Sequence, residues 1–268
     1  MREEPIGLLG RMSANLLGRR FSHFFTELVL IVAGVLIALA IDGWAEDRRE
    51  REAETEYLEL LLRDVREIEK EAQLQLEFEH DRVLTAGAAY TLLQGPNPAA
   101  SGAEIGVAIS SLTMRRTINL GSATYEQMVS SGHLQLLQNR ELRDRLVRHF
   151  ADMRRSEMIF SKNNQDLIDD VIVPYVMNDG ISFRARDNEI IASVNRATDI
   201  QNEALGADFR PPLDSVLVQP PDAESWNDMR RQLLFRLNIA ANGQARAELA
   251  LEQNRVIATA IAAELETR

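Results

Sequence analysis

The feature that most constrains this chain is an unbroken run of fourteen apolar or small residues, Leu28 to Ile41. A helix that crosses a bilayer core needs ~20 residues, and extending the run from Phe24 to Trp44 gives 21. The run therefore predicts an uncleaved transmembrane helix over residues 21–44. A buried helix of a soluble protein and a signal peptide are the alternatives, although the residues after Ile41 make a poor cleavage site.

Residues in and around this segment suit a membrane anchor. Gly34 and Ala38 form a small-xxx-small pair, which would let a second helix pack closely. Residues 1–20 are expected to form a flexible tail or an interfacial helix. Candidate interfacial anchors lie at both ends of the segment: Arg19, Arg20 and Trp44.

Two features bear on the orientation in the membrane: the arginines on each side of the anchor, and the lengths of the two segments that flank it. Three arginines lie close to each end of the anchor, so the positive-inside count is a tie. The preceding segment is short, whereas residues 45–268 follow, and long domains translocate largely regardless of charge. We therefore expect the N-terminus inside and the large domain outside.

Residues 45–268 carry the composition of a folded helical domain. Hydrophobic residues make up 45% and charged residues 26% of the chain, which excludes wholesale disorder. Long amphipathic helices are predicted over about 45–93, 139–178 and 225–267, with Pro174 and Gly180 closing the second. The fold class is all-α: one N-terminal transmembrane helix continues into an elongated antiparallel helical bundle with short extra helices and one irregular loop region.

The first long helix shows its core face in the spacing of its apolar residues. They lie three and four residues apart, and the pattern then shifts by four residues before it resumes. Such a shift in a heptad pattern predicts a stutter. The two parts of the stripe are Leu58, Leu61, Val65, Ile68 and Ala72, and then Leu76, Val83, Ala86 and Tyr90.

Shorter helices are marked by capping residues. Ser101 and Glu104 match a capping box for a helix over about 102–114. Ser122 and Asn139 are expected to cap the helices that follow them.

Residues 181–222 form the irregular part, and the sequence assigns them no role. Asn188 to Ala204 is expected to hold one more helix. As an alternative, the short apolar runs Ile181–Phe183 and Val216–Val218 would pair as strands.

One cluster combines aromatic, apolar and small residues and is a candidate docking corner. Its members are Tyr125, Met128, Gly132, Leu134 and Leu137. A helix–turn–helix packing corner is the favoured interpretation. A small-molecule pocket and a docking site for a partner are the alternatives.

The sequence contains no recognisable catalytic, cofactor or metal motif. The chain has no Cys, and its net charge of −11 argues against nucleic-acid binding. Glu77 and His80 share a helix face, but a di-iron site needs a second Glu-x-x-His motif, so a solvated face is favoured. Six arginines between residues 140 and 155 alternate with acids, which favours a self-neutralising face over an anionic-lipid site.

Two stretches carry a family resemblance. The first is Glu27 to Leu39, followed by Ile41, Trp44 and Glu46; the second is Tyr125-Glu126, Ser131 to Leu134, Leu137, Asn139, Leu142-Arg143, Leu146 and Phe150. Together they resemble a family of bacterial single-pass membrane proteins known only as domain of unknown function family 6090. The resemblance implies a membrane anchor and a helical domain, and it implies no activity. The expected location is the bacterial inner membrane, and the orientation argued above would make the large domain periplasmic.

These features predict a membrane-tethered, non-enzymatic interaction protein, an accessory or scaffold subunit of a larger membrane protein complex. Its expected partners are the lipid bilayer and other membrane protein subunits or a second copy of the chain, with no cofactor and no nucleic acid. The alternative is an extracytoplasmic sensory or signal-input module that acts through a separate partner chain.

Overall fold

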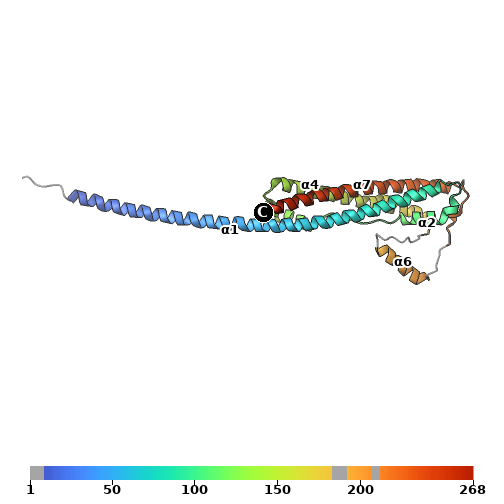
Figure 1. Ribbon diagram of the computed structural model, residues 1–268, viewed down its shortest axis with the longest axis horizontal. Coiled ribbons are helices and arrows are strands. Elements are labelled where there is room, and N and C mark those ends of the chain that lie inside the picture. Colours follow the sequence, from blue (N-terminus) through green and yellow to red (C-terminus); the bar gives the residue numbers. More distant parts are fainter. Residues whose placement is uncertain (1–8, 183–191, 207–211, 268) are drawn as a thin grey trace, which may run out of the picture. The chain divides into compact units, whose positions relative to one another are not determined.

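The regular structure of this protein is helical throughout the part that the computed structural model describes, which is residues 9–182, 192–206 and 212–267 (Figure 1). The all-α prediction is therefore confirmed for these residues. The strand alternative is wrong for Val216–Val218, because these residues lie in the 3₁₀ helix η4 (Ser215–Val218). Phe183 of the other expected strand lies outside the described residues.

The chain divides into two units, residues 1–56 and 57–268. Helix α1 (Leu9–Leu93) has residues in both. The elements that follow are the 3₁₀ helix η1 (Pro98–Ser101), α2 (Gly102–Ser111), α3 (Ala123–Ser131), the 3₁₀ helix η2 (His133–Leu136), α4 (Arg140–Lys162), the π-helix η3 (Asn163–Ile172), α5 (Val173–Asn178), α6 (Ala192–Leu205), η4 and α7 (Glu224–Glu266).

Within the second unit, α4, α7 and the C-terminal part of α1 pack around shared apolar residues (Figure 1). An ion pair of 3.0 Å joins Glu69 to Arg255, and Arg230 Nη2 donates to the carbonyl of Leu93 at 2.7 Å. Helix α7 therefore runs opposite to α1. Asn139 Nδ2 donates to Glu264 at 2.6 Å, which places the start of α4 beside the end of α7.

The core face of α1 keeps an unbroken heptad spacing from residue 58 to residue 93. The series of buried residues is Leu58, Leu61, Val65, Ile68, Ala72, Gln75, Glu79, Arg82, Ala86, Ala89 and Leu93. Its first five members confirm the predicted stripe. The predicted stutter is wrong, because the polar residues Gln75, Glu79 and Arg82 occupy the core positions where the apolar pattern was expected to shift.

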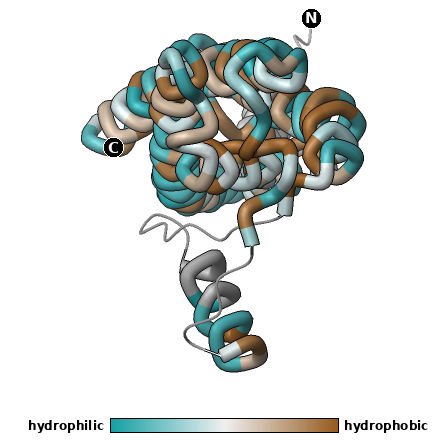
Figure 2. The backbone as a smooth tube through the Cα atoms, turned by 90° about the vertical axis from the view of Figure 1, so that its right-hand side faces the viewer, coloured by the Kyte–Doolittle hydropathy of each residue, from teal (hydrophilic) through white to brown (hydrophobic). Residues whose placement is uncertain are grey.

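The two partner helices show the same alternation of three and four. The buried series of α7 is Trp226, Met229, Leu233, Arg236, Ala240, Gly243, Ala247, Ala250, Asn254, Ile257 and Ile261, and that of α4 is Leu142, Leu146, His149, Met153, Ser156 and Phe160. This spacing lets the side chains of one helix fit between those of its neighbours. Hydrophobic and hydrophilic residues recur in turn along the helices of the unit (Figure 2).

Two of the three predicted caps are present. Ser122 Oγ accepts from the backbone N–H of Tyr125 at 3.0 Å, and Asn139 Oδ1 accepts from that of Leu142 at 3.1 Å. Ser101 makes no side-chain cap hydrogen bond, because it belongs to the 3₁₀ turn that leads into α2. Helix α2 ends at Ser111, earlier than the expected residue 114.

Pro174 does not close a helix, contrary to the sequence prediction. The π-helical segment η3 precedes it, and Pro174 lies in the first turn of α5. Proline is tolerated there because the first N–H groups of a helix have no partner within it. Gly180, which has a φ of 65°, follows the end of α5.

The contact between α2 and η4 yields a first prediction. A Cβ atom at Gly102 would lie 2.4 Å from the backbone oxygen of Leu217, so Gly102→Ala must displace one backbone segment. We expect a loss of about 1–3 kcal/mol in the free energy of unfolding, as for overpacked cores. Urea unfolding of the full chain in detergent, followed by circular dichroism, measures it.

Gly87→Ala is the matched control, because a Cβ atom there meets nothing within 4 Å. In the interior of α1 this change should stabilise the protein by about 0.5–1 kcal/mol. Equal effects of the two substitutions would contradict the assigned backbone contact.

Candidate functional site

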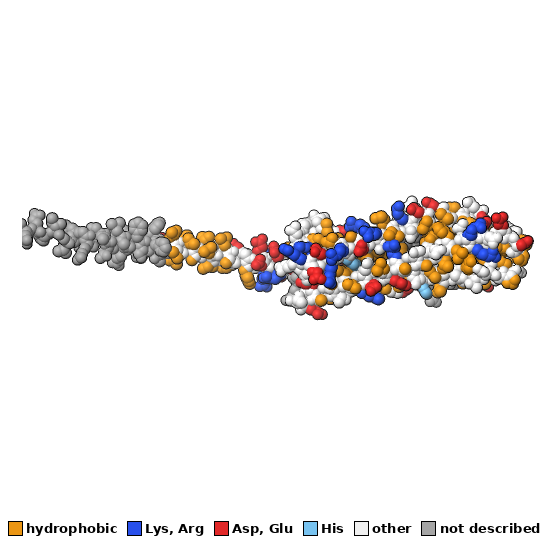
Figure 3. All heavy atoms as spheres, turned by 90° about the horizontal axis from the view of Figure 1, so that it is seen from above, with side chains coloured by type: hydrophobic (Ala, Val, Ile, Leu, Met, Phe, Trp, Pro, Cys, Tyr) orange, Lys and Arg blue, Asp and Glu red, His pale blue; other side chains and the backbone are white. Residues whose placement is uncertain are grey.

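Residues 28–41 of α1 expose apolar side chains around the whole helix. Leu30, Ile31 and Leu39 are 68%, 60% and 62% exposed, and hydrophobic side chains cover this stretch in Figure 3. Among the described residues, this is the one helix that is long and apolar enough to cross a membrane. An apolar surface of this size requires a cover, such as lipid or a partner helix.

The predicted packing pair and anchors are placed as follows. A Cβ atom at Gly34 would meet nothing within 4 Å, and Ala38 is exposed, so this side of the helix is open. Trp44 is exposed as well. Arg19 and Arg20 belong to α1, but their side chains lie outside the described part of the chain.

The residues of the candidate docking corner lie close together, and most of them belong to the hydrophobic core. Met128 and Leu137 are fully buried, Tyr125 is almost so, and Leu134 packs against the same apolar cluster. Gly132 ends α3 with a φ of 76°, a conformation that suits glycine. The ring of Tyr125 stacks on Phe150 at 4.3 Å.

A cavity of about 410 Å³, here called the Tyr125 cavity, opens beside this stack. The loop before α3, the first turn of α3 and the outer face of α4 line it. Its polar groups include Arg154 and Glu126, which lie 3.7 Å apart, and Lys162. Burial raises the pKa of Tyr125, and the charge of Arg154 opposes this shift. Its volume and mixed lining suit a small molecule with an apolar part and a charged group.

The wall of the cavity is tied to α1. Asp64 Oδ2 accepts from Ser122 Oγ at 2.8 Å and from the backbone N–H of Thr124 at 3.1 Å. A carboxylate at the start of a helix is favoured by the helix dipole. A displacement of the first turn of α3 would therefore act on α1 directly.

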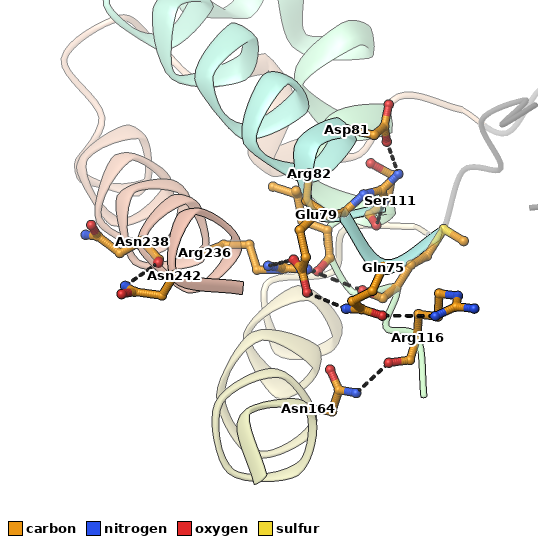
Figure 4. Close-up of polar contacts among 12 residues, drawn as sticks. Gln75, Glu79, Asp81, Arg82, Ser111, Arg116, Asn164, Arg236, Asn238 and Asn242 are labelled. Carbon is orange, nitrogen blue, oxygen red and sulfur yellow. Dashed lines mark hydrogen bonds and ion pairs between the residues drawn. The ribbon is translucent and has the colours of Figure 1, made fainter. Parts of the chain in front are cut away.

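A second polar site lies inside the bundle and is called here the charged layer: Gln75, Glu79 and Arg82 of α1, and Arg236 of α7 (Figure 4). All four side chains are buried. Gln75 Nε2 donates to Glu79 Oε1 at 2.9 Å, and Arg236 Nη1 lies 3.9 Å from Glu79 Oε2. Figure 4 shows these side chains converging from the two helices.

The two arginines of the charged layer hold the end of α2. Arg82 Nη1 donates to the carbonyl of Ser111 at 2.6 Å, and Arg236 Nε donates to that of Leu112 at 3.0 Å. The last carbonyls of a helix have no partner within it, and positive charge is favoured there. Arg236 is thus a partner for the carbonyl of Leu112, and Arg82 is a second donor to the carbonyl of Ser111, which also accepts from the backbone N–H of Met114 at 3.2 Å.

Burial shifts the pKa values of two side chains in the charged layer, Glu79 and Arg236. It raises the pKa of Glu79, while Arg236 and Arg82 oppose the shift. It lowers the pKa of Arg236 to about 10, so this side chain stays cationic at neutral pH. A Cβ atom at Gly243 would lie 2.7 Å from Glu79 Cδ, so α7 needs glycine where the carboxylate packs.

The spacing of apolar residues does not reveal the charged layer, because its members are polar. The signal was present, because continuing the alternation of three and four past Ala72 leads to Gln75, Glu79 and Arg82. His80, which the sequence did single out, is exposed. Within the described ranges, no group of three or more His, Cys, Asp or Glu side chains is placed to hold a metal ion.

His149 occupies a core position of α4. Burial lowers the pKa of His149 to about 4, while Asn254 and Asp152 oppose the shift. Its ring meets Phe150 edge-on at 5.0 Å. The fold therefore favours the neutral imidazole.

Acid should destabilise this protein through His149. Its pKa lies below the ordinary 6.5 of the unfolded chain, so the unfolded state binds the proton first as the pH falls. The contribution of the neutral ring to the free energy of unfolding is complete above pH 6.5. It is lost as the pH falls towards 4, and the total loss is about 3 kcal/mol. Urea unfolding across this range should show a shallower pH dependence for His149→Leu.

His80→Leu, a change at an exposed site, is the control and should keep the wild-type pH dependence. An unchanged pH profile in His149→Leu would exclude His149 as the titrating group.

Arg236→Met should leave Glu79 buried without its partner and should free the carbonyl of Leu112. We expect a loss of about 3–5 kcal/mol in the free energy of unfolding, as for broken buried ion pairs. Arg231→Met removes a charge at a site that is 68% exposed and should cost less than about 0.5 kcal/mol. Thermal unfolding measures both losses, and Arg236→Met should lower the melting temperature much more than Arg231→Met.

No protein-family model matches the chain, and neither does any curated protein or solved structure.

Proposed function

We propose that this chain is a membrane-tethered interaction protein, an accessory or scaffold subunit of a larger membrane protein complex. The observation that carries the proposal is the apolar surface of residues 28–41, which is exposed around the whole helix. Such a surface is stable in lipid and unstable in water. The helical unit of residues 57–268 would be the part that meets other proteins.

The dimensions of the anchor support a single crossing. Residues 21–44 would span ~36 Å as a helix, against a hydrocarbon core of ~30 Å. Trp44 would lie at one interface, and Arg19 and Arg20 at the other. The proposed orientation has the N-terminus inside and residues 45–268 outside, because long domains translocate largely regardless of charge. The proposed membrane is the inner membrane of a bacterium, because the family that the chain resembles, domain of unknown function family 6090, is bacterial.

Contacts within the membrane would run along one side of the anchor. The absence of any atom within 4 Å of a Cβ at Gly34 leaves room for a neighbouring helix, and Ala38 lies one turn further along. Small residues at this spacing let backbones approach, which is how helices associate in lipid. This side is therefore the proposed contact with another subunit or with a second copy.

The Tyr125 cavity favours a second candidate, a sensory module. A ligand there would touch the first turn of α3, which Asp64 ties to α1. Since α1 also contains the proposed anchor, ligand binding would act on the helix that enters the membrane. In this candidate the module acts through a separate partner chain.

Extraction of the native membrane in mild detergent tests the leading proposal. We expect the wild-type chain to elute as a large particle with stoichiometric companions, which mass spectrometry identifies. Gly34→Leu should release the companions by filling the small-residue side of the anchor. A particle no larger than a monomer or homodimer in its micelle would contradict a stable complex and favour the sensory module.

Gly43→Leu is the matched control, because a Cβ atom there also meets nothing within 4 Å, but it lies outside the small-residue pair. Its companions should remain bound. Loss of companions from both variants would show that the pair of Gly34 and Ala38 is not the contact.

A further inference from the structure

An apolar groove of about 560 Å³ lies between α1 and α2, within the second unit. Small side chains such as Ala88 and Ala108 line it, with Leu84 and Val107 beside them, and Asp81 and Glu104 add negative charge. Leu84 is 58% exposed although it belongs to the groove. Small residues flanked by larger apolar ones form the kind of groove that receives an amphipathic helix.

Helix α6 has the complementary pattern. Apolar residues Val194, Ala197, Ile200 and Ala204 recur at a spacing of three and four, with Leu205 beside them. At ~100° per residue they cover an arc of about 140°. Ile200 and Leu205 are 52% and 58% exposed, so the apolar face of α6 has no cover at these positions.

The attachment of α6 places it within reach of the groove. Asp214 accepts from the backbone N–H and from the hydroxyl of Ser182, at 2.9 and 2.6 Å, so the two ends of the connection that contains α6 are held together. Immediately afterwards, Leu217 is fully buried where η4 packs on Gly102 of α2. The groove lies on this same helix α2.

Residues 206–213, which connect α6 to Asp214, are long enough to let α6 reach the groove. Eight residues, 206–213, separate α6 from Asp214, and they span up to ~28 Å. A helix is ~10–12 Å across, so α6 can reach the other side of α2. Attachment within one chain raises the effective concentration of α6 at the groove.

We propose that α6 of the same chain occupies the α1–α2 groove, with Ile200 and Leu205 against the apolar lining. Arg196 borders Ile200 on the helix surface and would face the negative charge of Glu104. A partner helix that uses the groove must then displace α6, so α6 acts as an internal competitor for the groove. This inference does not depend on the membrane complex proposed above.

Introduced cysteines test the proposal cleanly, because the chain has none of its own. The full chain carrying Ile200→Cys and Leu84→Cys is oxidised mildly in native membrane vesicles. We expect a disulfide within one chain. The matched control pairs Leu84→Cys with Asn202→Cys, which lies on the opposite side of α6, and should form it at least tenfold more slowly.

Two results would overturn the proposal. Equal cross-linking of the two pairs, or none, would show that α6 does not present Ile200 to the groove. Cross-linked dimers would assign the groove to a second copy of the chain.

Hydrogen exchange gives an independent measurement without cysteines. Ile200→Asp should speed amide exchange in residues 84–92 severalfold by releasing α6, whereas Asn202→Asp should not. Unchanged exchange in the Ile200→Asp variant would contradict occupancy of the groove.

Discussion

The second unit depends on the charged layer, where α1 and α7 are joined to each other and to the end of α2. Glu79 packs against Gly243, lies near Arg236, and accepts a hydrogen bond from Gln75. The arginines extend these contacts to α2, whose last carbonyls they hold. Buried charges of this kind add little stability relative to an apolar core, but they specify the arrangement in which each charge is paired. The apolar layers on either side then pack in the only alignment that satisfies the charges.

Much of the architecture could be predicted from the sequence because the responsible forces act locally. Apolar spacing revealed the buried stripe from Leu58 to Ala72, and cap chemistry revealed the starts of α3 and α4. The charged layer could not be found from apolar spacing, because its residues are polar and their partners come from distant parts of the chain. The π-helix before Pro174 was missed because no local propensity specifies it. The Tyr125 corner was identified, but its cavity depends on how α3 rests on α4.

The proposed roles are assigned to different parts of the molecule. The apolar segment of α1 offers a surface for lipid and for a neighbouring helix, whereas the Tyr125 cavity offers a site of small-molecule size. The groove between α1 and α2 offers a third surface, of helix width. All three involve α1 or an element hydrogen-bonded to it.

The position of Glu79 opposite Gly243 has a mechanical consequence. A slide of α1 along its own axis by one turn, ~5.4 Å, would take the carboxylate away from the only glycine among the core positions of α7 and from Arg236. The contact of Glu79 with Gly243 and Arg236 therefore opposes sliding of α1 along α7. Within the second unit, a change that keeps this contact would have to move α1 without shifting its register against α7.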